Sequence, residues 1–226
     1  MRKITFAEAT LEALQGEFRR DEKTVHLGTD VAIPLRKEFG AARIRGTPIA
    51  ESSFVGAAIG LAGSGFRPVV NLRMATFGFV AMDQMVNQAA KITYMFGGQA
   101  RFPIVLRMTV GAGQSMAAQH SISPYPMYMN VPGLKIILPS TPYDAKGLLK
   151  TAIRDNNPGI GCEDRPPGGG RRGLPDLRGR GRDHLACGGG PAAVPLPQGA
   201  AGAGMRTGCP DPLQPAHGAL RHSGQG

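Results

Sequence analysis

The chain has 226 residues and a formal net charge of +10 at pH 7, enough length for one large domain or two small ones. The charge does not indicate nucleic-acid binding, because many arginines lie among glycine and proline near the C-terminal end, without aromatic residues to stack on bases. No apolar run approaches the roughly 20 residues that a membrane-spanning helix requires, so we expect no membrane association.

The first 75 residues alternate between helical and strand patterns. Thr5 and Glu8 have the spacing of a capping box, and apolar residues then recur at helical intervals, which predicts a helix over residues 6–19. Further elements are expected as a strand over 24–27, a helix over 33–39 ended by Gly40, a strand over 42–45, a helix over 51–61 and a strand over 68–72.

The same alternation continues to residue 154. A long helix is expected over 77–95, an apolar strand over 103–110, a loop from 111 to 120 and a buried strand over 134–138. Thr141 is expected to cap a last helix, with Pro142 at its first position, that ends at Arg154. Strands that alternate with helices predict an α/β fold, in which helices cover both faces of a parallel sheet.

The composition changes sharply at Pro158. Beyond it the chain has no Phe, Tyr or Lys and is rich in Gly, Pro, Arg and Ala, so it cannot bury enough apolar surface to offset its chain entropy. We therefore expect a folded domain over residues 1–158 and a low-complexity, unfolded tail over 159–226. The tail holds all three cysteines, and none forms a CxxC pair, so neither a zinc site nor a disulfide framework is indicated.

Two explanations of the tail are open. The first is a shift of the reading frame in a GC-rich gene, between Asn157 and about Pro166, because such DNA read out of frame yields this composition. The second is a natural low-complexity tail. Comparison of the three frames of the coding DNA distinguishes them.

Several short stretches, in this order, resemble the beta subunits of pyruvate, branched-chain and acetoin dehydrogenases. These subunits belong to the thiamine-diphosphate-dependent decarboxylating component of 2-oxoacid dehydrogenase complexes. The stretches are residues 47–51, 81–84, 87–91, 117–121, 132–135 and 139–148, within a resemblance that covers residues 2–158. The resemblance implies a transketolase-like domain that binds the aminopyrimidine ring of the cofactor. It also implies that an alpha subunit supplies the diphosphate and magnesium site, since this chain has no Gly-Asp-Gly motif.

The resemblance implies three site residues. Glu51 corresponds to the glutamate that activates the cofactor by a hydrogen bond to its aminopyrimidine ring, and Phe77 to the aromatic residue beside that ring. His120 corresponds to a histidine near the active-site channel that is implicated in acyl transfer to the lipoyl arm. Considered alone, the three are equally compatible with an acid at a helix N-terminus, a core phenylalanine and a histidine that orders its loop. Arg73 stands where relatives often carry Met, so a charge is expected near the ring pocket.

The resemblance also implies a potassium site made of backbone carbonyls and one carboxylate. Oxygen-only ligation suits a hard cation. The alternative for residues 155–157 is a helix stop before Pro158. The corresponding positions are Ile104, Ala152, Ile153, Asp155 and Asn157.

The implied function is that of a beta subunit in an assembly of two alpha and two beta chains. Together they would decarboxylate a pyruvate-like 2-oxo acid oxidatively and pass the acyl group to a lipoyl-bearing acyltransferase. The alternatives are an inactive or assembly-only fragment and another transketolase-like thiamine enzyme. Because residues 1–3 lead into an amphipathic helix rather than an apolar signal segment, a cytoplasmic location is expected.

Overall fold

The computed structural model describes residues 4–30, 32–110, 117–164 and the backbone of 185–187. These residues belong to the first of two compact units, which spans Met1–Gly189; the second unit, Gly190–Gly226, lies outside the described residues. None of the described helices is long and apolar enough to cross a membrane. Apart from 159–164 and 185–187, the segment expected to be an unfolded tail also lies outside the description.

The helices and strands follow the predicted alternation closely as far as residue 74. Thr5 caps the first helix through a complete capping box: the Glu8 amide donates to Thr5 Oγ1 at 3.2 Å, and the Thr5 amide donates to Glu8 Oε2 at 2.7 Å. Gly40 leaves the helical conformation with φ 78°. The elements are α1 (Phe6–Arg20), β1 (Thr24–Gly28), α2 (Ile33–Arg43), β2 (Ile44–Gly46), α3 (Glu51–Gly63) and β3 (Arg67–Met74).

The long helix expected over residues 77–95 is wrong: that segment is divided into three short helical pieces. The Ala90 amide donates to the Met85 oxygen, five residues earlier, at 3.1 Å, so the helix widens locally and departs from α-helical spacing. Gly78, in the first piece, approaches the Tyr128 hydroxyl so closely that a Cβ on the glycine would lie 2.6 Å from it. The pieces are the 3-10 helix η1 (Ala75–Phe79), the π-helix η2 (Gln84–Ala89) and α4 (Ile92–Met95).

The remaining elements complete one sheet. They are β4 (Val105–Val110), α5 (Ala117–His120), α6 (Tyr125–Met129), β5 (Lys135–Ile137), α7 (Pro142–Arg154), β6 (Gly159–Asp164) and β7 (Leu185–Cys187). Thr141 caps α7 as predicted, since its hydroxyl accepts from the Asp144 amide at 3.1 Å. The strand order is β2-β1-β3-β4-β6-β5-β7, with parallel pairing throughout except between β5 and β7.

The domain boundary expected at residue 158 is corrected by β6. This strand pairs with β4 over its whole length and with β5 on its other side, so it lies inside the sheet. It also carries Ile160 at 0% and Cys162 at 2% exposure into the core. The sequence did not predict this strand because Gly159 and Gly161 have low strand propensity. Ladder hydrogen bonds to two neighbours outweigh that propensity here.

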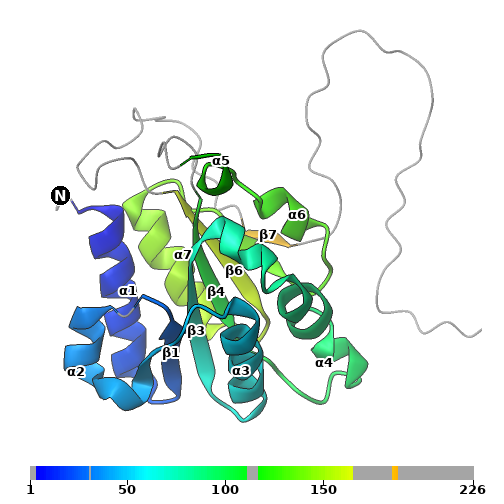
Figure 1. Ribbon diagram of the computed structural model, residues 1–226. Coiled ribbons are helices and arrows are strands. Elements are labelled where there is room, and N and C mark those ends of the chain that lie inside the picture. The colour runs from blue at the N-terminus through cyan, green and yellow to red at the C-terminus, as the bar shows by residue number, and fades with distance from the viewer. Residues whose placement is uncertain (1–3, 31, 111–116, 165–184, 188–226) are drawn as a thin grey trace, which may run out of the picture. The chain divides into compact units, whose positions relative to one another are not determined.

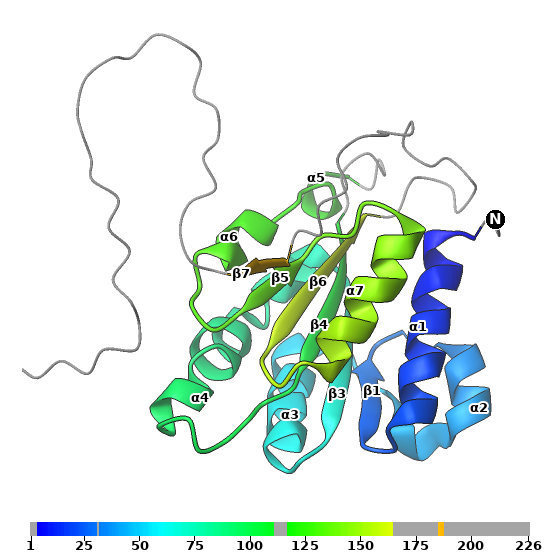
Figure 2. The same cartoon turned by 180° about the vertical axis from the view of Figure 1, so that it is seen from behind.

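Helices cover both faces of the sheet, as the alternation of elements predicted (Figures 1 and 2). Side chains alternate between the two faces along each strand. Val69 and Val105 pack against α1 and α7, whereas Val70 and Leu106 pack in the larger cluster that includes α3. The sheet is therefore a rigid platform between two apolar layers, and its strand ends can hold functional side chains in place.

Buried His26 in β1 makes folding depend on pH. The pKa of His26 falls to about 4, first through burial and second through the charge of Arg107. An unfolded chain takes up this proton near pH 6.5, while the folded chain stays neutral until about pH 4. Stability is therefore lost as the pH falls through that window, by on the order of 3 kcal/mol. Urea unfolding of the wild type and of His26→Gln is measured from pH 7 to 4.5. The free energy of unfolding should fall less steeply with falling pH in the variant than in the wild type. Equal pH dependence of the two proteins would contradict this.

Candidate active site

Glu51, Phe77 and His120 lie in elements that follow the carboxyl ends of parallel strands, at one edge of the sheet. In the strand order β2-β1-β3 the chain leaves β1 to one side and returns to its other side, and ligands of parallel α/β sheets commonly bind beyond the carboxyl ends of the strands at such a switch point. Gly28 ends β1 there with φ 154°, and a Cβ on it would lie 2.5 Å from the Asn71 carbonyl oxygen of β3. α3 follows β2 at this edge, η1 follows β3, and α5 follows β4.

Glu51 is the first residue of α3 and is only 5% exposed. Within the described part of the chain, its carboxylate has no hydrogen-bond or ion-pair partner. The N-terminal end of α3 stabilises a negative charge at this position. The arrangement leaves a carboxylate available to accept a hydrogen bond from a bound group.

Phe77 and His120 lie side by side, although they come from different elements. Their ring centroids are 5.3 Å apart and the planes meet edge to face at 86°. The neighbouring residue, Thr76, places its Oγ1 3.2 Å from His120 Nδ1. Both rings are half-buried, so part of each remains open to a ligand.

A hydrogen bond connects the start of α3 to the end of η1. The Ser52 hydroxyl, one residue after Glu51, donates to the Val80 carbonyl oxygen. Val80 directly follows η1, the element that carries Thr76 and Phe77. α3, which carries Glu51, is therefore held to η1, which contacts His120.

Gly78 allows η1 to pack directly against Tyr128 in the core. Tyr128 beneath it is fully buried, and its hydroxyl has no hydrogen-bond partner among the described residues. Burial, with a smaller contribution from Cys162, raises the pKa of Tyr128 to about 12. The phenol is therefore neutral at physiological pH.

We expect Gly78→Ala to destabilise the fold by about 1–3 kcal/mol, because the added methyl group overpacks against the tyrosine oxygen. Tyr128→Phe removes that oxygen and an unsatisfied hydroxyl, so it should be neutral or stabilising. Chemical denaturation of both single variants and the double variant measures the coupling. The double variant should recover most of the loss, and additive effects would contradict the proposed contact.

Arg73 lies at a distortion near the end of β3. It has φ 64°, and the register between β3 and β4 shifts between Asn71 and Arg73. The Arg73 amide donates to Asn71 Oδ1 at 3.1 Å, and the side chain is exposed. Arg73 thus lies near the carboxyl end of β3, in the kind of bulge that often re-aims a side chain near a site, and a charge close to the ring pocket stays a prediction.

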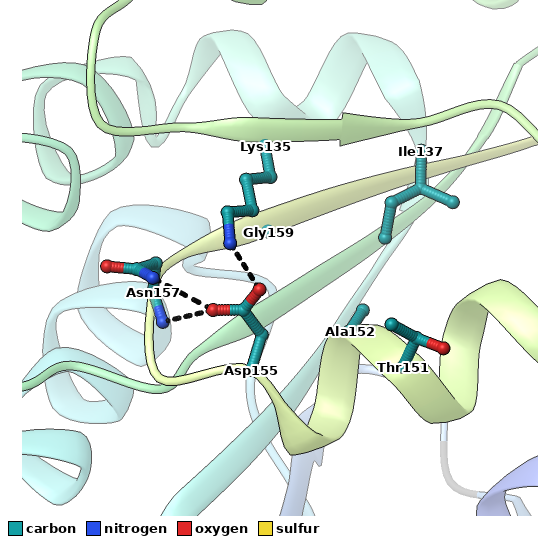
Figure 3. A pocket seen from close by; sticks show the side chains of 7 residues that line it. All are labelled: Lys135, Ile137, Thr151, Ala152, Asp155, Asn157 and Gly159. Carbon is teal, nitrogen blue, oxygen red and sulfur yellow. Dashed lines mark hydrogen bonds and ion pairs between the residues drawn. The ribbon is translucent and has the colours of Figure 1, made fainter. Parts of the chain in front are cut away.

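The residues predicted to hold potassium gather at the end of α7, far along the sheet from Glu51. A cavity of about 10 Å³, which fits about one water-sized atom, is lined by Ala152, Asp155 and Asn157 among others (Figure 3). In Figure 3 the Asp155 carboxylate accepts from Lys135 Nζ and from the amide and side chain of Asn157. Burial opposes ionisation, but these hydrogen bonds outweigh it and keep the pKa of Asp155 below its usual value.

The backbone oxygens of this region each have a donor. Arg67 Nη1 donates to the Ile153 and Asp155 oxygens at 3.1 and 3.0 Å, and the Gly159 amide donates to the Ile104 oxygen at 2.9 Å. A carbonyl oxygen has two lone pairs, so each can still coordinate a cation. The positive charges of Arg67 and Lys135 border these oxygens and oppose the binding of any further cation, most of all one of high charge. Among metal ions, a monovalent one is therefore the least disfavoured here.

No cluster of three or more His, Cys, Asp or Glu side chains that could hold a metal ion occurs among the described residues. Sequence reasoning also missed two residues at the edge, Thr76 and Ser52. Both act through contacts with residues at least 28 positions away, which no local pattern reveals.

The parallel sheet and its carboxyl-edge site define the class of protein. Residues 2–167 match the family described as "Transketolase, pyrimidine binding domain", so the chain belongs to this family. A solved structure described as "Split gene transketolase, inactive beta4 tetramer" has the same fold, with a TM-score of 0.60 and 20% identity over 73% of this chain and 52% of that chain.

Within this class, the resemblance to 2-oxoacid dehydrogenase beta subunits is confirmed. The chain is 44% identical over 180 residues to the acetoin:2,6-dichlorophenolindophenol oxidoreductase subunit beta of Cupriavidus necator, covering 72% of this chain and 53% of the relative. It is 44% identical over 170 residues to the pyruvate dehydrogenase E1 component subunit beta of Rickettsia felis, covering 71% and 52%. The chain thus spans about half the length of these relatives.

Proposed function

We propose that the chain acts as the pyrimidine-binding part of a 2-oxoacid dehydrogenase beta subunit. Together with an alpha subunit, it would decarboxylate a pyruvate-like 2-oxo acid oxidatively and pass the acyl group to lipoyl lysine. The observation that carries the proposal is Glu51 at the carboxyl edge, a residue only 5% exposed whose carboxylate has no partner among the described residues. Membership of the family and similarity to acetoin and pyruvate dehydrogenase subunits support it.

Thiamine diphosphate would supply the nucleophilic carbon that adds to the 2-oxo acid. Glu51 would accept a hydrogen bond from a ring nitrogen of the aminopyrimidine and so hold that ring in its basic tautomer. Phe77 would contribute apolar contact area beside the ring and exclude water from it. His120 would donate or accept a proton during transfer of the acyl group to the lipoyl arm.

The partners are part of the same proposal. An alpha subunit would hold the diphosphate and Mg²⁺, in an assembly of two alpha and two beta chains, and a lipoyl-bearing acyltransferase would receive the acyl group. We also propose a cytoplasmic location, with which the free thiol of buried Cys162 is compatible.

Co-expression with an alpha subunit tests the function. The purified mixture is assayed with pyruvate, branched-chain 2-oxo acids and acetoin, and reduction of a dye acceptor is followed. Thiamine-dependent turnover with one of these substrates is expected only when both chains are present. Stable assembly without turnover would favour an assembly-only fragment, and turnover with sugar phosphates would favour another transketolase-like enzyme; either result contradicts the proposal.

We further propose that a potassium ion binds at the end of α7, with oxygens of Ile104, Ala152, Ile153, Asp155 and Asn157 as ligands. If so, 100 mM KCl should raise the thermal midpoint by about 2–4 °C over 100 mM choline chloride. Asp155→Asn should abolish this increment, while Asp144→Asn, on the exposed first turn of α7, should retain it. Equal midpoints of the wild type in both salts would contradict a potassium site.

A further inference from the structure

Thr76 stands out among the residues to which the proposed function assigns no role. It lies in η1, directly before Phe77, and its side-chain hydroxyl contacts the imidazole of His120, at 3.2 Å from Nδ1. The two residues are 44 positions apart in the sequence. The contact therefore depends on the fold rather than on local chain geometry.

His120 is held from two directions by consecutive residues of η1. The Thr76 hydroxyl contacts the ring at Nδ1, while Phe77 meets it edge to face at 86°. The hydrogen bond fixes the rotation of the imidazole and engages one nitrogen, and the aromatic contact limits its tilt. Only Nε2 is left to meet another group.

Contacts on two sides fix the position of η1, so Thr76 is itself held in place. Gly78 packs against Tyr128 from below, and the Val80 carbonyl accepts from Ser52 at the start of α3. α5, by contrast, is a four-residue helix without buried side chains. The position of His120 therefore depends more on η1 than on its own helix.

We propose that Thr76 is a positioning residue for His120. Its hydroxyl, which can donate to Nδ1 or accept from it, would hold the imidazole in one orientation and present Nε2 at the carboxyl edge. The proposal deepens the function suggested above, since it rests on His120 as the group that handles the proton during acyl transfer. The hydroxyl itself would contact neither substrate nor cofactor.

NMR of the full 226-residue chain, labelled with ¹⁵N-histidine, tests this without any cofactor. Because the chain has five histidines, His120→Gln identifies the signals of interest. In the wild type at pH 8, the Nδ1 shift of His120 should be displaced in the way that a hydrogen bond at this nitrogen produces. Thr76→Val keeps the side-chain shape but lacks the hydroxyl, so this displacement should disappear. Thr76→Ser restores the hydroxyl and should restore the displacement.

Unchanged His120 shifts in Thr76→Val, or an equal change in Thr76→Ser, would overturn the proposal. In the reconstituted alpha–beta assembly, Thr76→Val should lower the rate of acyl transfer to the lipoyl group about five- to tenfold, with dye-coupled decarboxylation unchanged. Thr76→Ser should transfer at the wild-type rate. Because the NMR result does not depend on turnover, it holds or fails separately from the proposed enzyme function.

Discussion

Glu51→Gln is expected to reduce thiamine-dependent decarboxylation by about a hundredfold or more, since it replaces the proposed proton-accepting carboxylate with an amide. The same substitution should leave the free energy of unfolding unchanged or raise it, because the buried carboxylate has no partner in the described structure to lose. Turnover is measured in the alpha–beta assembly, and stability by urea unfolding of the chain alone.

A matched control separates this result from a general effect of losing a helix N-terminal acid. Glu8 lies in the first turn of α1, where it is exposed and forms part of the capping box. Glu8→Gln should leave turnover unchanged and cost at most about 1 kcal/mol of stability. If Glu51→Gln instead lowered stability by several kcal/mol and kept turnover, Glu51 would be a structural residue.

Glu163→Gln is expected to destabilise the fold by on the order of 3 kcal/mol. Arg107 Nε and Nη2 donate to Glu163 Oε1 at 2.8 and 2.6 Å, and both residues are almost fully buried. Removal of the negative charge leaves a buried guanidinium without its counter-ion, which costs far more than the pair contributes. Urea unfolding measures the loss.

The exposed pair Arg19–Glu38 provides the control for Glu163. Its arginine side chain is 61% exposed, so Glu38→Gln should change stability by only about 0–1 kcal/mol. Equal small effects of the two substitutions would mean that β6 contributes little to the fold. That outcome would contradict the corrected boundary and restore the domain end predicted at residue 158.

Local signals in the sequence predicted much of the fold. The Thr5–Glu8 capping box and the Thr141 cap each depend on residues three positions apart, so the sequence alone reveals them. The long helix over 77–95 was wrong because the chain widens locally into a π-helix, which the spacing of apolar residues does not reveal. The domain end at 158 was wrong because β6 is completed by two strands that precede it in the chain.

For the candidate site, too, the sequence indicates single residues but not the contacts between distant ones. The resemblance singled out Glu51, Phe77 and His120, and their roles stay predictions until they are tested. The sequence could not reveal that Thr76 contacts His120, because that pairing exists only once β3 and β4 lie side by side. The frame shift between Asn157 and about Pro166 also stays a prediction.

Hydrogen–deuterium exchange at the thiazolium carbon of bound thiamine diphosphate tests the central claim most directly, because it reports activation of the cofactor before any substrate reacts. In the reconstituted assembly, exchange should be at least about a hundredfold slower with Glu51→Gln than with the wild type or Glu8→Gln. Equal exchange rates in all three would show that the Glu51 carboxylate does not activate the cofactor.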